Sequence, residues 1–135
     1  MNKEQLAPAF DAVGFGKLIG ARVEEIEPDL ARVVLPFRPD VVTFADIVHG
    51  GAIAGLLDIA ATAAAWSTVE DMTKARGTTI GFSITYLEAA RGKDVVAEAR
   101  VIRRGKQIIY LEVELTSDGR EVARGLVTYK LDLVA

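Results

Sequence analysis

The stretch that decides the fold is residues 49–67, HGGAIAGLLDIAATAAAWS, which predicts a helix that ends at about Ser67. Alanine and leucine dominate this stretch, and both are strong helix formers. Apolar side chains occur on every side of the predicted helix, as is typical of a helix enclosed by other elements. Its longest apolar run, residues 52–66, is shorter than the ~20 residues that a membrane crossing needs. The sequence therefore predicts a buried helix inside a folded domain.

Residues on both sides of this helix alternate between apolar and polar, which is the pattern of β-strands. The predicted strands are residues 21–27, 31–37, 79–86, 95–103, 109–115 and 121–133. Turns at Glu27-Pro28-Asp29 and Asp118-Gly119 join neighbouring strands, and short turns favour antiparallel pairing. Residues 3–16 predict one short amphipathic helix that ends near Gly14 and Gly16. Residues 37–48 are too irregular for a strand and predict a loop that could cover a site.

About six strands must then cover one helix that is hydrophobic all round. The economical arrangement is a curved antiparallel sheet wrapped around the helix, which is an α+β fold. We expect one domain over residues 1–135, because domains most often have roughly 100–150 residues. One sheet leaves half of the helix uncovered, so a second copy of the chain is expected to cover the rest.

The composition excludes several classes of function. The formal net charge of −3 argues against a nucleic-acid-binding protein. The chain has no cysteine and one histidine, so neither a thiol nucleophile nor a histidine-rich metal centre can form within it. The N-terminal residues lead into no long apolar run, so we expect no signal peptide, no membrane partner and a cytoplasmic location.

Asp58 does not fit the core of the predicted helix. An ionised carboxylate is costly to bury unless it is paired or hydrogen-bonded, and aspartate is unfavourable inside a helix. One interpretation is a structural aspartate that bonds to backbone or pairs with Arg or Lys across an interface. The other is a carboxylate that is kept for chemistry.

The start of the helix favours the second interpretation. Gly50 lies there, and a helix N-terminus offers free N–H groups with a partial positive charge. The pair Gly50-Gly51 would let a ligand oxygen approach the backbone, although tight helix–sheet packing also explains it. Eight residues span roughly 12 Å of helix, which is too far for Gly50 and Asp58 of one chain to grip one small group. His49, the only histidine, is expected to cap the helix rather than transfer a proton.

A resemblance to a known family appears at these residues. Val48-His49-Gly50-Gly51-Ala52, followed after five residues by Asp58-Ile59-Ala60, resembles the signature of hot-dog-fold thioesterases of the phenylacetic-acid-degradation (PaaI-like) type. Residues 79–90, TIGFSITYLEAA, are similar to the central strand of that family, and residues 91–115 to its following hairpin. The resemblance covers residues 14–133 and implies the hot-dog fold.

The resemblance also implies an activity, namely hydrolysis of an acyl- or aryl-CoA thioester to the free acid and CoA, with no metal and no cofactor. Asp58 would act as nucleophile or as general base for water. The Gly50 amide of the opposing subunit would polarise the thioester carbonyl, with His49 beside it, and Thr79 would position water or substrate. The assembly implied is a homo-oligomer, either a dimer or a dimer of dimers (a homotetramer).

The sequence departs from the family pattern at two positions. Thr43 stands where relatives often have Asn or Gln as a second polar contact near the scissile group, and Gly81 replaces an acidic residue. The further substrate-binding candidates are Gly51 and Phe44 near the reacting and acyl groups, and basic residues for the CoA phosphates. The basic candidates are Arg103, Arg104 and Lys106, with Arg91 and Lys93 at the preceding turn, although charges at turns are often only solvated.

Two other functions remain open at the level of sequence. A hot-dog enoyl-CoA hydratase or dehydratase would use His49 and Asp58 as a pair in one site. A non-catalytic acyl-CoA-binding protein would keep the fold without the activity, and Thr43 in place of the usual amide leaves room for it.

Overall fold

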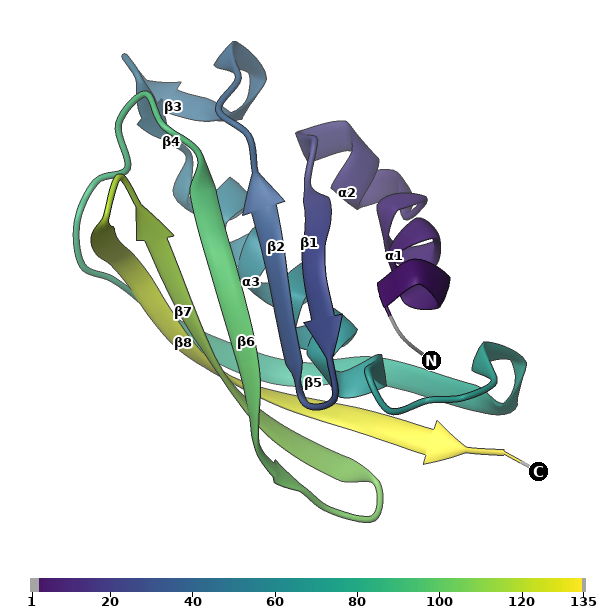
Figure 1. The fold of residues 1–135 in the computed structure, drawn as a ribbon. Helices are drawn as coiled ribbons and strands as arrows, with labels where there is room; N and C mark the ends of the chain where they lie inside the picture. Colours follow the sequence, from purple (N-terminus) through teal and green to yellow (C-terminus); the bar gives the residue numbers. More distant parts are fainter. Residues whose placement is uncertain (1–2, 135) are drawn as a thin grey trace.

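The computed structural model describes residues 3–134 (Figure 1). In chain order its elements are α1 (Lys3–Asp11), α2 (Gly14–Ile19), β1 (Arg22–Glu27), β2 (Leu30–Leu35), η1 (Pro39–Val41), β3 (Val42–Phe44), β4 (Ile47–Val48), α3 (Gly50–Trp66), η2 (Met72–Lys74), β5 (Ala75–Tyr86), β6 (Val95–Arg104), β7 (Ile108–Ser117) and β8 (Arg120–Leu133). No helix among these described residues is long and apolar enough to cross a membrane.

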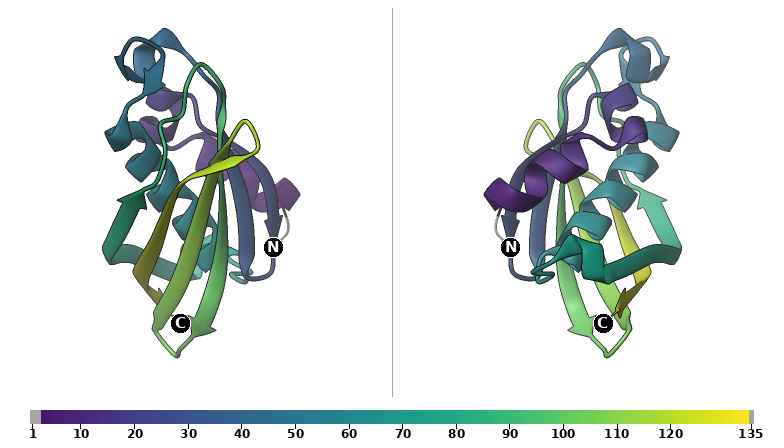
Figure 2. Two further views of the ribbon diagram at one scale, coloured as in Figure 1. Left: turned by 90° about the vertical axis from the view of Figure 1, so that its left-hand side faces the viewer. Right: turned by 90° about the vertical axis from the view of Figure 1, so that its right-hand side faces the viewer.

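Six strands form one antiparallel sheet in the order β1-β2-β6-β7-β8-β5. The sheet curves, and α3 lies along one of its faces (Figures 1 and 2). Figure 2 shows α1 and α2 on the same side of the sheet, next to β1. The predicted α+β fold, a curved antiparallel sheet around one central helix, is therefore confirmed.

The core lies between α3 and the central strands. The residues of β7 that face α3 are all buried: Ile109, Leu111, Val113 and Leu115. On β6, Ala97 and Ala99 lie opposite two of them in the strand register, and both alanines are also buried. Small residues at these positions let the alanine-rich helix approach the sheet closely, so apolar contact extends along most of its length.

The helix is not enclosed all round in the single chain, as predicted for one helix covered by one sheet. Leu56, Leu57 and Ala60 are fully buried on the side that faces the sheet. The opposite side is a half-exposed stripe of residues at helical spacing: Ala54, Gly55, Asp58, Ile59 and Thr62. Uniform hydrophobicity indicates that a helix becomes covered, but it does not say whether its own sheet does all the covering. We call this side the open face of α3.

The N-terminal segment forms two short helices where one was predicted. Gly14 and Gly16, expected to end a helix, instead lie inside α2. Gly16 is buried near Ile59, and the ring of Phe15 lies so close to Gly55 that a Cβ at Gly55 would come within 2.6 Å of it. The glycines therefore allow α2 to pack against one border of the open face.

Residues 37–48 contain more structure than the predicted loop. They hold η1 and the small antiparallel pair β3–β4, which turns at Ala45 with a φ of 52°. The Val48 N–H donates to the Ala90 carbonyl at 2.9 Å, and the His49 N–H donates to the Val41 carbonyl at 2.7 Å. These bonds fix the chain where it enters α3.

Candidate active site

Asp58 and Thr79 meet at the open face of α3. The Thr79 hydroxyl donates to Asp58 Oδ1 at 2.7 Å. Thr79 lies on β5 opposite the buried Tyr129 of β8, so its side chain is directed to the helix side of the sheet. The two residues lie 21 positions apart in the sequence and are brought together by β5 crossing the helix.

The carboxylate of Asp58 is otherwise available. It forms no ion pair with any Lys or Arg whose side chain the structure describes, and none of the described groups donates to its second oxygen. Asp58 is half-buried, so the charge is partly removed from water but still reachable. Within the single chain, the interpretation as a structural ion pair therefore has no partner to support it.

A second group of polar side chains lies next to Asp58, and the sequence analysis missed it. Trp66 Nε1 donates to the Tyr129 hydroxyl at 2.8 Å. Burial raises the pKa of Tyr129, while hydrogen bonds with Trp66 and Thr62 act in the opposite direction. A Cβ at Gly77 would lie 2.4 Å from the Tyr129 hydroxyl oxygen, so only glycine leaves room for this contact. The sequence contains one indication of this polar group, because Thr62 follows Asp58 by one turn on the same face of the helix.

The start of α3 presents a free backbone donor. His49 caps the helix, because its Nδ1 accepts from the Gly51 N–H at 2.7 Å. The Gly50 N–H has no hydrogen-bond partner in the part of the chain that the structure describes. The Gly50 carbonyl accepts from the Tyr86 hydroxyl at 2.7 Å, another contact that the sequence analysis missed. A free N–H at the positive end of a helix is a suitable donor to a developing oxyanion.

Asp58 and Gly50 belong to the same helix, eight residues apart. The helical rise separates them by roughly 12 Å along the axis, so the distance predicted from the sequence stands. One chain therefore holds a carboxylate and an oxyanion donor that cannot serve the same thioester carbonyl.

The other predicted contacts near the reacting group lie around the start of α3. Thr43 and Phe44 are on β3, and both are exposed, Phe44 by 77%. Gly51 is exposed in the first turn of the helix. These residues share one end of the molecule with Gly50, because β3 and β4 lead directly into the helix (Figure 1).

Three of the predicted phosphate contacts, Arg103, Arg104 and Lys106, lie at the opposite end of α3, whereas Arg91 pairs with Asp46 beside β4 at the helix start. Arg104 donates to the Ala65 and Ala64 carbonyls at 3.1 and 3.3 Å and forms an ion pair with Asp29 at 2.8 Å. Its guanidinium thus holds the C-terminal end of the helix and is already engaged. Arg103 and Lys106, in and after the same strand, are exposed and remain available.

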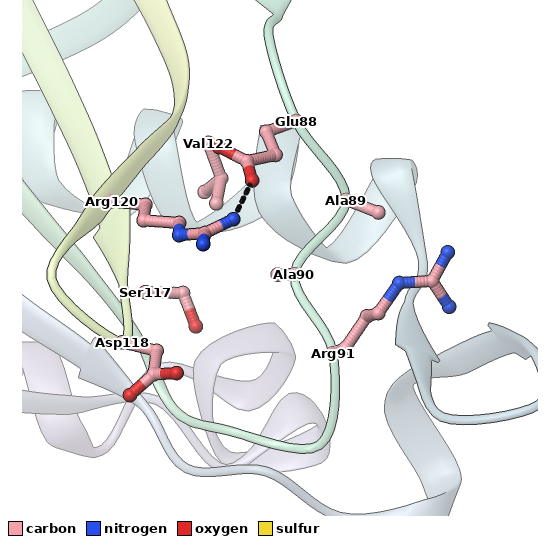
Figure 3. A pocket seen from close by; sticks show the side chains of 8 residues that line it. All are labelled: Glu88, Ala89, Ala90, Arg91, Ser117, Asp118, Arg120 and Val122. Atoms are coloured by element: carbon pink, nitrogen blue, oxygen red, sulfur yellow. Dashed lines mark hydrogen bonds and ion pairs between the residues drawn. The ribbon is translucent and has the colours of Figure 1, made fainter.

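Two cavities of the single chain lie away from Asp58. One, of about 510 Å³, lies between the segment after β5 and the β7–β8 turn, and an ion pair between Glu88 and Arg120 crosses it (Figure 3). Arg91 and Asp118 also line it, so its charges balance. The other, of about 610 Å³, lies by Leu126. Neither includes Asp58 or Gly50.

Comparisons with known proteins agree on a family. Residues 45–124 match the model of the Thioesterase superfamily. The chain is 34% identical over 87 residues to acyl-coenzyme A thioesterase 13 from Homo sapiens, covering 62% of this chain and 60% of that protein. It is 29% identical over 129 residues to a medium/long-chain acyl-CoA thioesterase from Escherichia coli, covering 85% and 83%.

Solved structures agree on the fold. A mutant thioesterase from Pseudomonas aeruginosa superposes with a TM-score of 0.86 at 22% identity, covering 99% of this chain and 96% of that one. A mutant of the phenylacetic acid degradation protein PaaI from Thermus thermophilus superposes with a TM-score of 0.76 at 23% identity, covering 86% and 96%. At these identities the likeness establishes the hot-dog fold alone. The family model matches more than half of the sequence, and this chain accordingly belongs to the Thioesterase superfamily and is a thioester hydrolase.

Proposed function

We propose that the chain hydrolyses an acyl-CoA or aryl-CoA thioester to the free acid and CoA, with Asp58 as the catalytic carboxylate. The observation that carries the proposal is the 2.7 Å hydrogen bond from Thr79 to one oxygen of Asp58, which leaves the other oxygen free. Two of the relatives are named as acyl-CoA thioesterases, which supports the class of substrate.

The chemistry requires few groups. Thiols ionise near pH ~8.5, so the CoA thiolate leaves without a strong acid to protonate it. In one route Asp58 takes a proton from a water molecule while that water adds to the carbonyl carbon. The C–S bond then breaks, and the CoA thiolate leaves. Alternatively, Asp58 attacks the carbonyl itself and forms an anhydride that water then opens. In both routes Thr79 orients the carboxylate so that its free oxygen points to the reacting group.

The oxyanion donor comes from a second copy of the chain in this proposal. The Gly50 N–H is free, but it lies too far from Asp58 of its own chain to act on the same carbonyl. Strand β5 has a partner on one side only, and it carries exposed apolar residues: Ile80, Phe82, Tyr86 and, just after it, Leu87. An unpaired, apolar sheet edge beside the open face of α3 is a surface that a second copy would cover. A dimer would place the Gly50 of one copy near Asp58 of the other.

The remaining predicted contacts take supporting roles. Thr43, Phe44 and Gly51 surround the start of α3, where they would contact the thioester and the acyl group. Arg103 and Lys106 are the candidates for the CoA phosphates. Arg104 is the weakest of the predicted phosphate contacts, because its donors are engaged with Asp29 and the end of α3.

The test is release of free thiol from a panel of acyl-CoA and aryl-CoA substrates by the wild type and by Asp58→Asn and Asp58→Ala. We expect both substitutions to lower kcat by about 1000-fold or more, as loss of a catalytic group commonly does. Asp58→Asn should stay folded, because its side-chain oxygen can still accept from Thr79. Asp118→Asn, at an exposed turn, is the matched control and should keep the wild-type rate.

The other outcomes decide against the proposal in distinct ways. Hydrolysis that survives both substitutions removes Asp58 from the mechanism. Binding of acyl-CoA without thiol release favours a non-catalytic binding protein, and hydration of an enoyl-CoA without thiol release favours the hydratase. Entry of label into the Asp58 carboxylate during a single turnover in ¹⁸O-labelled water identifies the nucleophilic route with water attack on the Asp58 side of the anhydride, because general-base catalysis places the label only in the product acid.

A further inference from the structure

Tyr86 holds the first peptide of α3 from outside the helix. Its hydroxyl donates to the Gly50 carbonyl at 2.7 Å, and a Cβ at Gly50 would lie 3.3 Å from both the hydroxyl oxygen and the ring. The Tyr86 ring is half-exposed, so burial does not account for its position. The close approach depends on glycine at position 50, which means that Gly50 serves this contact as well as offering its own N–H.

This hydrogen bond continues through the peptide to His49. The Gly50 carbonyl and the Gly51 N–H belong to one peptide unit, and that N–H donates to His49 Nδ1 at 2.7 Å. A bond received by the carbonyl polarises the peptide and makes its N–H a stronger donor. Because Nδ1 accepts, the neutral imidazole carries its proton on Nε2. The chain of donors therefore ends in an Nε2–H on an exposed ring.

Neighbouring elements, β8 and η1, fix both ends of this chain of hydrogen bonds. The residue after Tyr86, Leu87, donates its N–H to the Val122 carbonyl at 2.9 Å, which holds the end of β5 against β8. On the other side, the His49 N–H is held by the Val41 carbonyl. Two consecutive glycines would otherwise be the most freely rotating part of the helix start. The tyrosine hydroxyl opposes rotation of the Gly50–Gly51 peptide, which would turn the Gly51 N–H away from His49 Nδ1.

We propose that Tyr86 is a positioning residue for thioester hydrolysis: through the Gly50–Gly51 peptide it holds the His49 ring so that the Nε2–H points outward, beside the free Gly50 N–H, as a donor to the thioester carbonyl oxygen. The proposal rests on the function proposed above and assigns the helix start a second donor, His49, and a residue that aligns it. Tyr86 itself does not touch the substrate.

The kinetic test compares Tyr86→Phe, which removes only the hydroxyl, with the wild type on an acyl-CoA that the wild type hydrolyses. We expect kcat to fall about three- to tenfold, the range for one neutral hydrogen bond, while KM changes less than about twofold. The control is Tyr110→Phe, since Tyr110 is similarly exposed but lies on β7. It should keep the wild-type kcat, and both variants should keep the wild-type Tm.

A spectroscopic test reads the alignment without any substrate. The chain contains one histidine, so a ¹⁵N-correlated NMR spectrum of the imidazole reports His49 alone. We expect the Nε2–H tautomer to dominate in the wild type and in Tyr110→Phe. In Tyr86→Phe the weaker Gly51 donor should let the Nδ1–H tautomer gain population.

The outcomes separate this proposal from the proposed function. Hydrolysis that depends on Asp58, with kcat and the His49 tautomer both unchanged in Tyr86→Phe, overturns the role of Tyr86 alone. A fall in kcat with an unchanged tautomer, or an equal fall in Tyr110→Phe, also overturns it. Failure of the wild type to release thiol from any substrate overturns the proposed function, and with it this role of Tyr86.

Discussion

Strands β7 and β5 belong to one sheet but differ in how their inward faces are covered. β7 has partners on both sides, and every residue that it directs toward α3 is buried. β5 is paired only with β8, and along it Phe82 and Tyr86 are 44% and 50% exposed although they lie opposite buried residues of β8. The same alternation of apolar residues thus gives a fully buried core in the centre of the sheet and a partly exposed one at its edge. Asp58, Thr79 and the start of α3 all lie at this partly exposed edge.

The largest difference between the two strands should appear in stability. Leu111→Ala on β7 removes a fully buried side chain, and we expect it to lower the free energy of unfolding by about 2–5 kcal/mol. Phe82→Ala on β5 should cost under about 1 kcal/mol in the dissociated chain, because the ring is already exposed. Denaturant unfolding at low and high protein concentration measures both. A cost for Phe82→Ala that rises with concentration would show that a second copy buries this ring, whereas equal costs for the two variants at every concentration would break the comparison.

The second-largest difference between the two regions is expected in self-association of the chain. Ile80→Lys places a charge at the exposed edge of β5, and we expect it to weaken self-association by about 100-fold or more, since an unpaired charge at an interface costs several kcal/mol. The control is Ile102→Lys on β6, because Ile80 and Ile102 are 56% and 58% exposed. Light scattering across a dilution series measures the mass. If Ile102→Lys dissociates while Ile80→Lys stays associated, the interface lies away from β5.

The smallest effect concerns the outer faces of the two regions. Beside β7, Glu98 of β6 accepts from Arg32 at 2.9 Å, and this hydrogen bond holds the pKa of Glu98 below its ordinary value of 4.5. The stability that it supplies is therefore present above pH 4.5 and is lost as the pH falls through the lower pKa of the folded state. Glu98→Gln should lower the free energy of unfolding at pH 7 by less than about 1 kcal/mol.

The measurement for Glu98→Gln is denaturant unfolding from pH 7 downward, with the expected difference from the wild type narrowing below pH 4.5. On β5, the outward-facing Ser83 and Thr85 carry no charge, so Ser83→Ala is a control with no such pH dependence. A difference for Glu98→Gln that stays constant with pH would show that the charge of Glu98 is not what stabilises the central strands.

The sequence predicted the six main strands because their alternation is long and strongly apolar. The pair β3–β4 was missed, since strands of three and two residues are too short to show a period and depend on distant bonds such as that from Val48 to Ala90. The division between α1 and α2 was missed because Gly14 and Gly16 were interpreted as helix ends, while the packing of Gly16 against Ile59 of α3 depends on tertiary structure.

The candidate site was partly accessible from the sequence. Asp58 stood out because a carboxylate in an apolar helix breaks a pattern, and the family resemblance supplied Thr79. Tyr86 and Tyr129 were missed because both continue the alternation of their strands and so resemble ordinary core residues. Whether a hydroxyl on such a residue meets a helix carbonyl or an indole is decided by distance in the folded chain, which periodicity does not encode.

The bonds of Arg104 make the two ends of α3 mechanically unequal. At the last turn, Arg104 ties the carbonyls of Ala64 and Ala65 to Asp29, and Ser67 Oγ accepts from the Asp29 N–H at 2.8 Å. The helix is thus clamped to the β1–β2 turn at the end remote from the free Gly50 amide. In this chain, substitutions near the first turn of α3 therefore leave the hydrogen bonds at its last turn in place, so the helix stays attached to the sheet when the surroundings of Gly50 change.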